Sequence, residues 1–469
     1  MSFVQAEFLV FFLVVYTLYW AIPKQRWQNL LLSVAGAIFY GWIHPWFLIL
    51  LYSSAVLDFL SGLGQTRWPH RKKIFLAMSL CGNLGMLGYF KYFDFFVASV
   101  KTALDTLGVQ TSLHTLGIFL PVGISFYTFQ TMSYTIDVYR GKVKARRNVL
   151  DYLTFVSFFP QLVAGPVERA TNLLLQVEKP RRFVFDRMAS GLSLALWGVA
   201  KKMVVADTIA PYVDRIFTMR DPSGPMIWAA TLGFTIQILA DFSGYTDIAR
   251  GVARMLGFEL LLNFDHPYMA RSPSDFWRRW HISFSSWIRD YVYIPVGGSR
   301  GSSWCVTRNT FIAMVTSGIW HGASWNFALW GAYHAALLTA YRFVSRRIPR
   351  RIREQKGWDV VLVPLMFAFT WVGWLVFRET DVGRLLHWFT LNPMVATPDQ
   401  WVATTMMLAM CGVCGAILVG AMLIQQYVVP RMEGRIWLLP LQTAGWALCV
   451  IGMFVFTRLT VTDFIYFQF

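Results

Sequence analysis

Residues 358–377 read WDVVLVPLMFAFTWVGWLVF and carry one charged side chain, that of Asp359. A helix of this length rises about 30 Å, which matches the hydrocarbon thickness of a bilayer. Apolar stretches of similar length recur along the chain. The run therefore predicts one of several helices that cross a membrane.

Composition supports the same class of protein. The chain has 469 residues, of which 56% are hydrophobic and 14% are charged, whereas soluble domains carry about 25% charged residues. A water-soluble core could not hide so much apolar surface. The composition therefore excludes a soluble globular enzyme and favours a polytopic membrane protein.

The net charge of +17 comes from basic residues that cluster in short loops between apolar stretches. This arrangement follows the positive-inside rule, so it predicts membrane orientation and no nucleic-acid partner. A basic cytoplasmic face would also attract an anionic co-substrate.

The expected fold is all-α, with about 11–12 transmembrane helices in a single membrane domain over residues 1–469. The chain from 98 to 114 is expected to form a polar outer loop. Residues 150–169, interrupted by Pro160 and Pro166, are expected to form a re-entrant element. The predicted spans lie near 8–22, 28–42, 46–63, 74–97, 115–136, 187–217, 225–249, 309–321, 324–345, 358–377, 403–427 and 437–457.

Residues 317–326, SGIWHGASWN, place His321 between two predicted spans. A histidine ring titrates near neutral pH and can remove a proton from a hydroxyl group. The neighbouring glycines would let other groups approach closely. The alternative is a core histidine that only hydrogen-bonds a neighbouring helix.

Residues 275–291, DFWRRWHISFSSWIRDY, are expected to form one amphipathic helix rich in Trp and Arg. At helical spacing Trp277, Trp280, Phe284 and Trp287 share one side. Such a helix suits the membrane interface or a cavity wall. His281 is the candidate for a second polar group of the site.

A third polar cluster, residues 241–247, reads DFSGYTD and contains Asp241, Tyr245 and Asp247. Two acids six residues apart near the end of a predicted span could line a cavity. They could equally serve as hydrogen-bonding groups between helices. Both interpretations stay open from the residues alone.

No Gly-x-Ser-x-Gly elbow, phosphate-binding glycine loop or metal-spaced His/Cys set occurs in the sequence. Two classes therefore remain, a transferase that works inside the bilayer and a proton-coupled transporter with a relay histidine. No internal repeat is apparent, which weakens the transporter interpretation.

Several motifs resemble those of the membrane-bound O-acyltransferase superfamily. The resemblance is carried, in chain order, by LPVGISFY at 120–127, AGP at 164–166, DFSGY at 241–245, FWRRWHIS at 276–283, RDYVYIP at 289–295 and WHG at 320–322. The bacterial alginate and cellulose O-acetyltransferase-like branch is the most similar. The resemblance covers about residues 5–380, and the spans within 403–457 match nothing diagnostic.

The resemblance implies helices around a central funnel or tunnel, with His321 as the essential histidine and His281 as the second polar position. Acyl transfer also needs a donor for the developing oxyanion, for which His281 and the backbone N–H groups beside Gly322 are both candidates. The expected cavity-lining residues are Trp320, Gly322, Asp241, Tyr245 and Asn326. The expected donor-binding residues are Arg250, Arg278 and Arg279.

The implied activity is O-acetyl transfer from a cytoplasmic thioester, acetyl-CoA, across the bacterial inner membrane to an exopolysaccharide such as alginate or cellulose. No bound cofactor and no metal are expected. The implied partners are a periplasmic acetyltransferase- or esterase-like protein, the polysaccharide synthesis complex and membrane lipid. D-alanyl transfer to teichoic acid is the alternative within the superfamily.

Overall fold

The structure is a computed structural model that describes residues 1–42, 44–162, 165–348, 356–432 and 438–456. Every regular element in these ranges is helical, which confirms the all-α prediction. Ala164, from one of the sequence motifs, lies outside the described residues. The chain divides into two compact units, and the expectation of a single domain stays a prediction.

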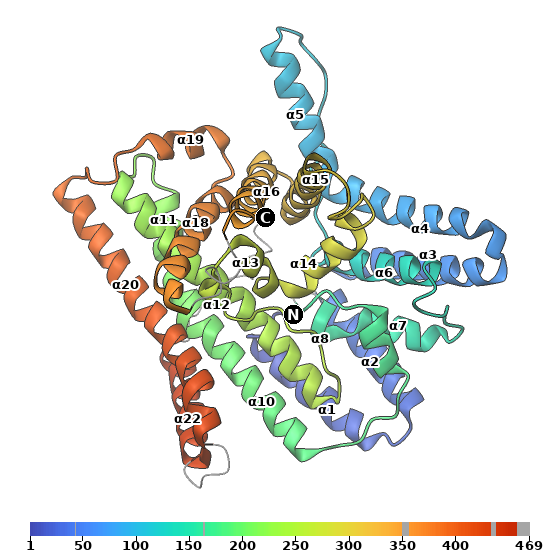
Figure 1. The fold of residues 1–469 in the computed structure, drawn as a ribbon. Coiled ribbons are helices and arrows are strands. Elements are labelled where there is room, and N and C mark those ends of the chain that lie inside the picture. The colour runs from blue at the N-terminus through green and yellow to red at the C-terminus, as the bar shows by residue number, and fades with distance from the viewer. Residues whose placement is uncertain (43, 163–164, 349–355, 433–437, 457–469) are drawn as a thin grey trace. The chain divides into compact units, whose positions relative to one another are not determined.

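The first unit comprises residues 1–192 and 249–261. Its helices (Figure 1) are α1 (Ala6–Ala21), α2 (Gln25–Gly41), α3 (Phe47–Arg67), α4 (Lys72–Leu87), α5 (Phe93–Thr106), α6 (Ile124–Tyr139), α7 (Val149–Ser157), α8 (Phe159–Leu162) and α9 (Leu175–Val177). Two further helices, α10 (Phe185–Ala200) and α12 (Gly224–Met255), contribute residues to both units.

A buried carboxylate ties three helices of the first unit together. Asp58 on α3 accepts hydrogen bonds from Ser79 and Asn83 on α4 and from Thr135 on α6. All four side chains are fully buried. Because buried polar groups are stable only when paired, this cluster specifies how α3, α4 and α6 meet.

The second unit comprises residues 193–248 and 262–469. Its helices are α11 (Asp207–Phe217), α13 (Pro273–Arg279), α14 (Ile282–Ile288), α15 (Ser303–His321), α16 (Trp325–Ser345), α18 (Asp359–Arg378), α19 (Val382–Thr390), α20 (Pro398–Leu423), α21 (Val429–Met432) and α22 (Leu438–Val455). A π-helical segment, Lys201–Ala206, links α10 to α11.

Six helical stretches of the described residues are long and apolar enough to cross a membrane, and two shorter helices are also apolar. The polytopic membrane fold is thereby confirmed. The number of eleven or twelve crossings stays a prediction. The six stretches are Phe47–Arg67, Pro69–Thr106, Phe185–Phe217, Gly224–Met255, Asp359–Arg378 and Pro398–Met432.

Two expected segments differ in the structure, and a third is described only in part. The predicted span 115–136 becomes helical only at Ile124. The preceding residue, Gly123, has a left-handed backbone with φ 78°, and a right-handed helix cannot continue through that conformation. The predicted outer loop 98–114 is helical as far as Thr106. Residues 149–162 form the short helices α7 and α8, which are separated at Phe158, and Pro160 lies within α8. The expected re-entrant element over 150–169 stays a prediction.

The expected single helix over 275–291 is wrong. The structure contains α13 and α14 instead, because His281 between them adopts a left-handed backbone conformation with φ 44°. An α-helix cannot continue through such a residue.

Helices α15 and α16 lie side by side in the second unit (Figure 1). They meet through two glycines, because a Cβ on Gly318 would overlap the carbonyl of Phe327, and a Cβ on Gly331 would overlap that of Met314. The hairpin therefore depends on backbone-to-backbone packing of the small-residue kind found between membrane helices.

We expect Gly318→Ala to destabilise the protein by about 1–3 kcal/mol, because the added methyl group must push α15 away from α16. Thermal unfolding of detergent-purified protein measures the loss. The matched control is Gly420→Ala on α20, where no atom lies within 4 Å of the added carbon. Equal midpoints for the two variants would contradict the packing argument.

Candidate active site

The turn at His281 is held by Asn263. The side chain of Asn263 accepts hydrogen bonds from the Ser283 backbone N–H at 3.2 Å and from the Ser283 hydroxyl at 2.6 Å. Its backbone carbonyl accepts from the Ile282 N–H at 2.9 Å. A left-handed non-glycine residue costs about 1–3 kcal/mol and persists only where its surroundings determine it. This backbone strain at a buried histidine is typical of functional sites.

Two aromatic rings connect His281 with His321. The rings of Phe284 and Trp320 pack on each other at 4.2 Å, and each contacts both histidines, at centroid distances between 4.9 and 6.2 Å. Both histidines are buried, with exposed fractions of 0% and 4%. The fold thus brings together the two residues that the sequence singled out.

His321 ends α15 and is enclosed by two further rings. Trp330 of α16 lies at 5.2 Å and nearly perpendicular, and Phe377 of α18 lies at 5.4 Å. Asn326 fixes this arrangement, since its amide donates to the Val376 and Phe377 carbonyls. Gly322 is required here because a side chain at that position would overlap the Phe327 ring.

His281 lies in the segment between the candidate spans Gly224–Met255 and Asp359–Arg378. Burial lowers the pKa of His281 to about 3. Its ring is therefore neutral at pH 7, and a neutral imidazole has one N–H donor and one acceptor nitrogen.

The acids of the third sequence cluster lie in ion pairs. Lys202 bridges Asp241 and Asp207 at 2.7 Å each, and its ammonium group lies over the Tyr245 ring. Lys201 pairs with Asp247 at 2.6 Å. The geometry therefore favours the second of the two sequence interpretations, polar contacts between helices.

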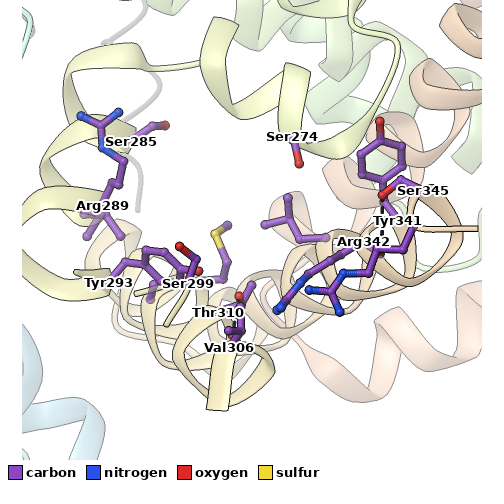
Figure 2. A pocket seen from close by; sticks show the side chains of 15 residues that line it. Ser274, Ser285, Arg289, Tyr293, Ser299, Val306, Thr310, Tyr341, Arg342 and Ser345 are labelled. Carbon is purple, nitrogen blue, oxygen red and sulfur yellow. Dashed lines mark hydrogen bonds between the residues drawn. The ribbon is translucent and has the colours of Figure 1, made fainter. Parts of the chain in front are cut away.

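A cavity of about 460 Å³ opens among α13, α14, α15 and α16 (Figure 2). Serine hydroxyls, two tyrosines and three arginines supply its polar lining. These residues are Ser274, Ser285, Ser299, Ser345, Tyr293, Tyr341, Arg289, Arg342 and Arg346. The Thr310 hydroxyl adds to them, and apolar residues such as Met314 and Leu338 complete the wall.

The cavity lies within about two helical turns of His281 and His321, along α14 and α15. On α14, Ser285 of the cavity is one turn from His281. On α15, Met314 of the cavity precedes His321 by seven residues, which corresponds to about 10 Å of helix. Polar and basic walls thus lie within two helical turns of the buried histidine pair.

The arginines expected to bind the donor do not line this cavity, and their role in donor binding stays a prediction. Arg279 pairs with Asp275 and Asp265, and Arg278 is exposed. Neither these two nor Arg250 lines the cavity. The basic residues at the cavity are Arg289, which directly follows α14, and Arg342 and Arg346 at the end of α16. The sequence did not single them out as a set, because only the fold brings these two segments together.

His334 was also missed. It is buried on α16, one turn from Trp330, and its ring lies 4.8 Å from that of Trp330. The available signal was a histidine inside the predicted span 324–345, since ionisable residues in spans are commonly functional.

The candidate site lies within the part of the chain that matches a known protein family. A family model described as MBOAT, membrane-bound O-acyltransferase family, matches residues 142–378, which include all three buried histidines. The probable alginate O-acetylase AlgI of Pseudomonas aeruginosa is 38% identical, over 81% of this chain and 73% of its own.

Two further relatives carry other names. The peptidoglycan O-acetyltransferase of Helicobacter pylori is 33% identical, over 76% of this chain and 72% of its own. The teichoic acid D-alanyltransferase of Bacillus subtilis is 28% identical, over 58% of this chain and 71% of its own. All three names describe acyl transfer.

If Asp241 is an ion-pair partner rather than a cavity residue, Lys202→Met should destabilise the protein by about 3–5 kcal/mol, because it leaves buried carboxylates uncompensated. Adding Asp241→Leu should recover part of the loss. Thermal unfolding of the two single variants and the double variant measures this coupling.

The control is Arg254→Met, which breaks a partly exposed pair with Glu259 and should cost below about 1 kcal/mol. A fully stable Asp241→Leu variant that has lost activity would instead restore the cavity-lining interpretation.

Proposed function

Because the chain belongs to the membrane-bound O-acyltransferase family, we propose that it moves an acetyl group from acetyl-CoA to a hydroxyl group destined for an exopolysaccharide. The protein is an O-acyltransferase and a multi-pass inner-membrane protein. The observation that supports the finer proposal is the buried His281–His321 pair beside a cavity lined by three arginines.

His321 is proposed as the general base. Its imidazole takes the proton of the acceptor hydroxyl while the hydroxyl oxygen bonds to the acetyl carbonyl carbon. The carbonyl oxygen becomes an oxyanion. Its collapse breaks the carbon–sulfur bond, and the leaving thiolate takes the proton back from the His321 imidazolium. The products are an acetyl ester and a free thiol.

His281 is proposed as the second polar group of the site. Its ring is neutral at pH 7, so it does not compete with His321 for the proton. One nitrogen of a neutral imidazole can donate a hydrogen bond and so orient the acceptor or the acetyl group. The rings of Phe284 and Trp320 maintain its distance from His321.

The cavity is proposed to hold the carrier part of the donor. Coenzyme A carries phosphates, and guanidinium groups bind phosphate oxygens through paired hydrogen bonds. In Figure 2, Arg289 and Arg342 lie on opposite sides of the cavity. Among the described residues, Arg342 has no ion-pair partner, so its charge is available to a ligand.

The acceptor is proposed to be reached through a periplasmic partner of the polysaccharide synthesis complex, as for an alginate or cellulose O-acetylation system. The two O-acetylating relatives named above are 38% and 33% identical, compared with 28% for the D-alanyl-transferring relative. This order supports acetyl over D-alanyl as the group transferred.

His321→Ala should reduce acetyl transfer by at least about 100-fold, since removal of a general base costs 10²–10⁴. The assay follows labelled acetyl released from acetyl-CoA by the purified protein in detergent and polymer acetylation in cells. His281→Ala should cost less. The control His387→Ala changes an exposed histidine of α19 and should leave transfer intact.

Near-normal acetylation by His321→Ala would refute the assignment of the base. Transport of an intact solute into proteoliposomes without thioester cleavage would refute the transferase. Turnover of D-alanyl-loaded carrier protein in preference to acetyl-CoA would support the alternative donor.

Arg342→Gln should raise the KM for acetyl-CoA about 5- to 10-fold with little change in kcat, because one charge-assisted contact to a phosphate contributes about 1–1.5 kcal/mol. Steady-state kinetics at low salt measures it. Arg384→Gln, which removes a paired arginine of α19, is the control. An unchanged KM for Arg342→Gln would place the donor elsewhere.

A further inference from the structure

Three ring nitrogens are buried together without hydrogen bonds in the part of the chain that the structure describes. They are Nε1 of Trp277, Nε1 of Trp330 and Nδ1 of His334, and the Nε1 of Trp374, whose ring lies 6.1 Å from that of Trp330, also lacks a hydrogen bond there. The Trp330 and His334 side chains are 0% and 2% exposed. Buried polar atoms in native proteins nearly always have partners, so three such neighbours indicate a place where a ligand can bind.

The three rings form one cluster. The centroid of Trp277 lies 5.6 Å from that of Trp330 and 5.1 Å from that of His334, and the Trp330 and His334 centroids are 4.8 Å apart. Each pair meets at a steep angle of 70–81°. Such edge-to-face contacts hold the rings rigidly.

The cluster lies between the cavity and His321. On α16, Leu338 lines the cavity, His334 follows one turn away, and Trp330 one turn further contacts the His321 ring at 5.2 Å. On α13, Ser274 lines the cavity and Trp277 lies three residues on. Two helices therefore lead from the cavity to the cluster within one or two turns.

The chemistry of the nitrogens defines the ligand. An indole N–H is a donor only, so two of the three groups can be satisfied only by an acceptor atom. A third contact can come from His334, whose nitrogen donates or accepts according to its tautomer. A ligand oxygen with accessible lone pairs fits this set, and a cation does not.

We propose that Trp277, Trp330 and His334 form the binding site for the acetyl carbonyl oxygen and stabilise the oxyanion that develops on it. This inference rests on the proposed acetyl transfer and adds three residues to it. During transfer the oxygen gains negative charge as the hydroxyl adds to the carbonyl carbon, and it loses that charge when the carbon–sulfur bond breaks. Donors already in place need no reorganisation at that moment.

The assignment separates this cluster from His281. His281 has its ring contacts with Phe242, Phe284 and Trp320. His334 contacts Phe276, Trp277 and Trp330. Trp330 is the residue that contacts both His321 and the new cluster.

The test replaces each indole by phenyl, which removes the N–H and retains an aromatic ring. Trp330→Phe and Trp277→Phe should each lower kcat for acetyl transfer about 100-fold, as loss of one oxyanion donor does, with the KM for acetyl-CoA changed by less than about twofold. His334→Leu should lower kcat, and His334→Gln should restore part of it because an amide can still hydrogen-bond.

The matched control is Trp371→Phe on α18. Its Nε1 is also buried without a hydrogen bond among the described residues, but its ring packs on Trp228. Trp371→Phe should retain kcat. Unfolding midpoints of all variants show whether each has folded.

A binding measurement distinguishes oxyanion stabilisation from a structural role. Free coenzyme A lacks the acetyl oxygen, so Trp330→Phe should bind it as tightly as the unchanged protein does. A trifluoromethyl ketone thioether of coenzyme A hydrates to a tetrahedral analogue, and Trp330→Phe should bind this analogue at least 10-fold more weakly.

The outcomes separate the two proposals. If the unchanged protein and His321→Ala transfer acetyl equally poorly, the proposed function fails. If the unchanged protein is active and Trp330→Phe matches Trp371→Phe in kcat and in analogue affinity, the cluster holds only a buried water and the inference is overturned.

Discussion

Backbone contact between α15 and α16 is the constraint on which the rest of the site depends. Gly318 and Gly331 let the two helices touch where any side chain would overlap a carbonyl. That approach brings Trp330 against the ring of His321. A wider separation would open the aromatic enclosure to lipid or water, and a buried imidazole in a rigid enclosure would be lost.

The site combines rigidly packed aromatic rings with buried nitrogen atoms that have no hydrogen bond among the described residues. Aromatic rings from α13, α14, α15, α16 and α18 pack around His281, His321 and His334, many of them edge to face. Such rings fill space and fix the angles between side chains, while the Nε1 atoms of Trp277 and Trp330 remain without hydrogen bonds among the described residues. A low-dielectric enclosure with prearranged donors suits a reaction in which charge appears only briefly.

Ionic contacts serve a different purpose in this protein. Lys201 and Lys202 pair with carboxylates of α11 and α12 in segments that are candidate spans. An unpaired charge within the membrane costs free energy, and each ion pair reduces that cost for both of its members. At the cavity, the exposed Arg289 pairs with Asp290, whereas Arg342 has no ion-pair partner among the described residues and is suited to a ligand. Burial thus separates the structural charges from those available for binding.

Sequence alone determined the class of protein, because apolar runs such as 358–377 can be stable only in a bilayer. It also singled out His281 and His321, because ionisable side chains within apolar segments are commonly functional. Tertiary structure decided what surrounds them. Whether Asp241 faces a cavity or Lys202, and whether Arg342 or Arg279 is free, depends on contacts between residues far apart in the chain. Local periodicity carries no information about such contacts, and it missed the left-handed turn at His281 because Asn263, 18 residues earlier, holds it.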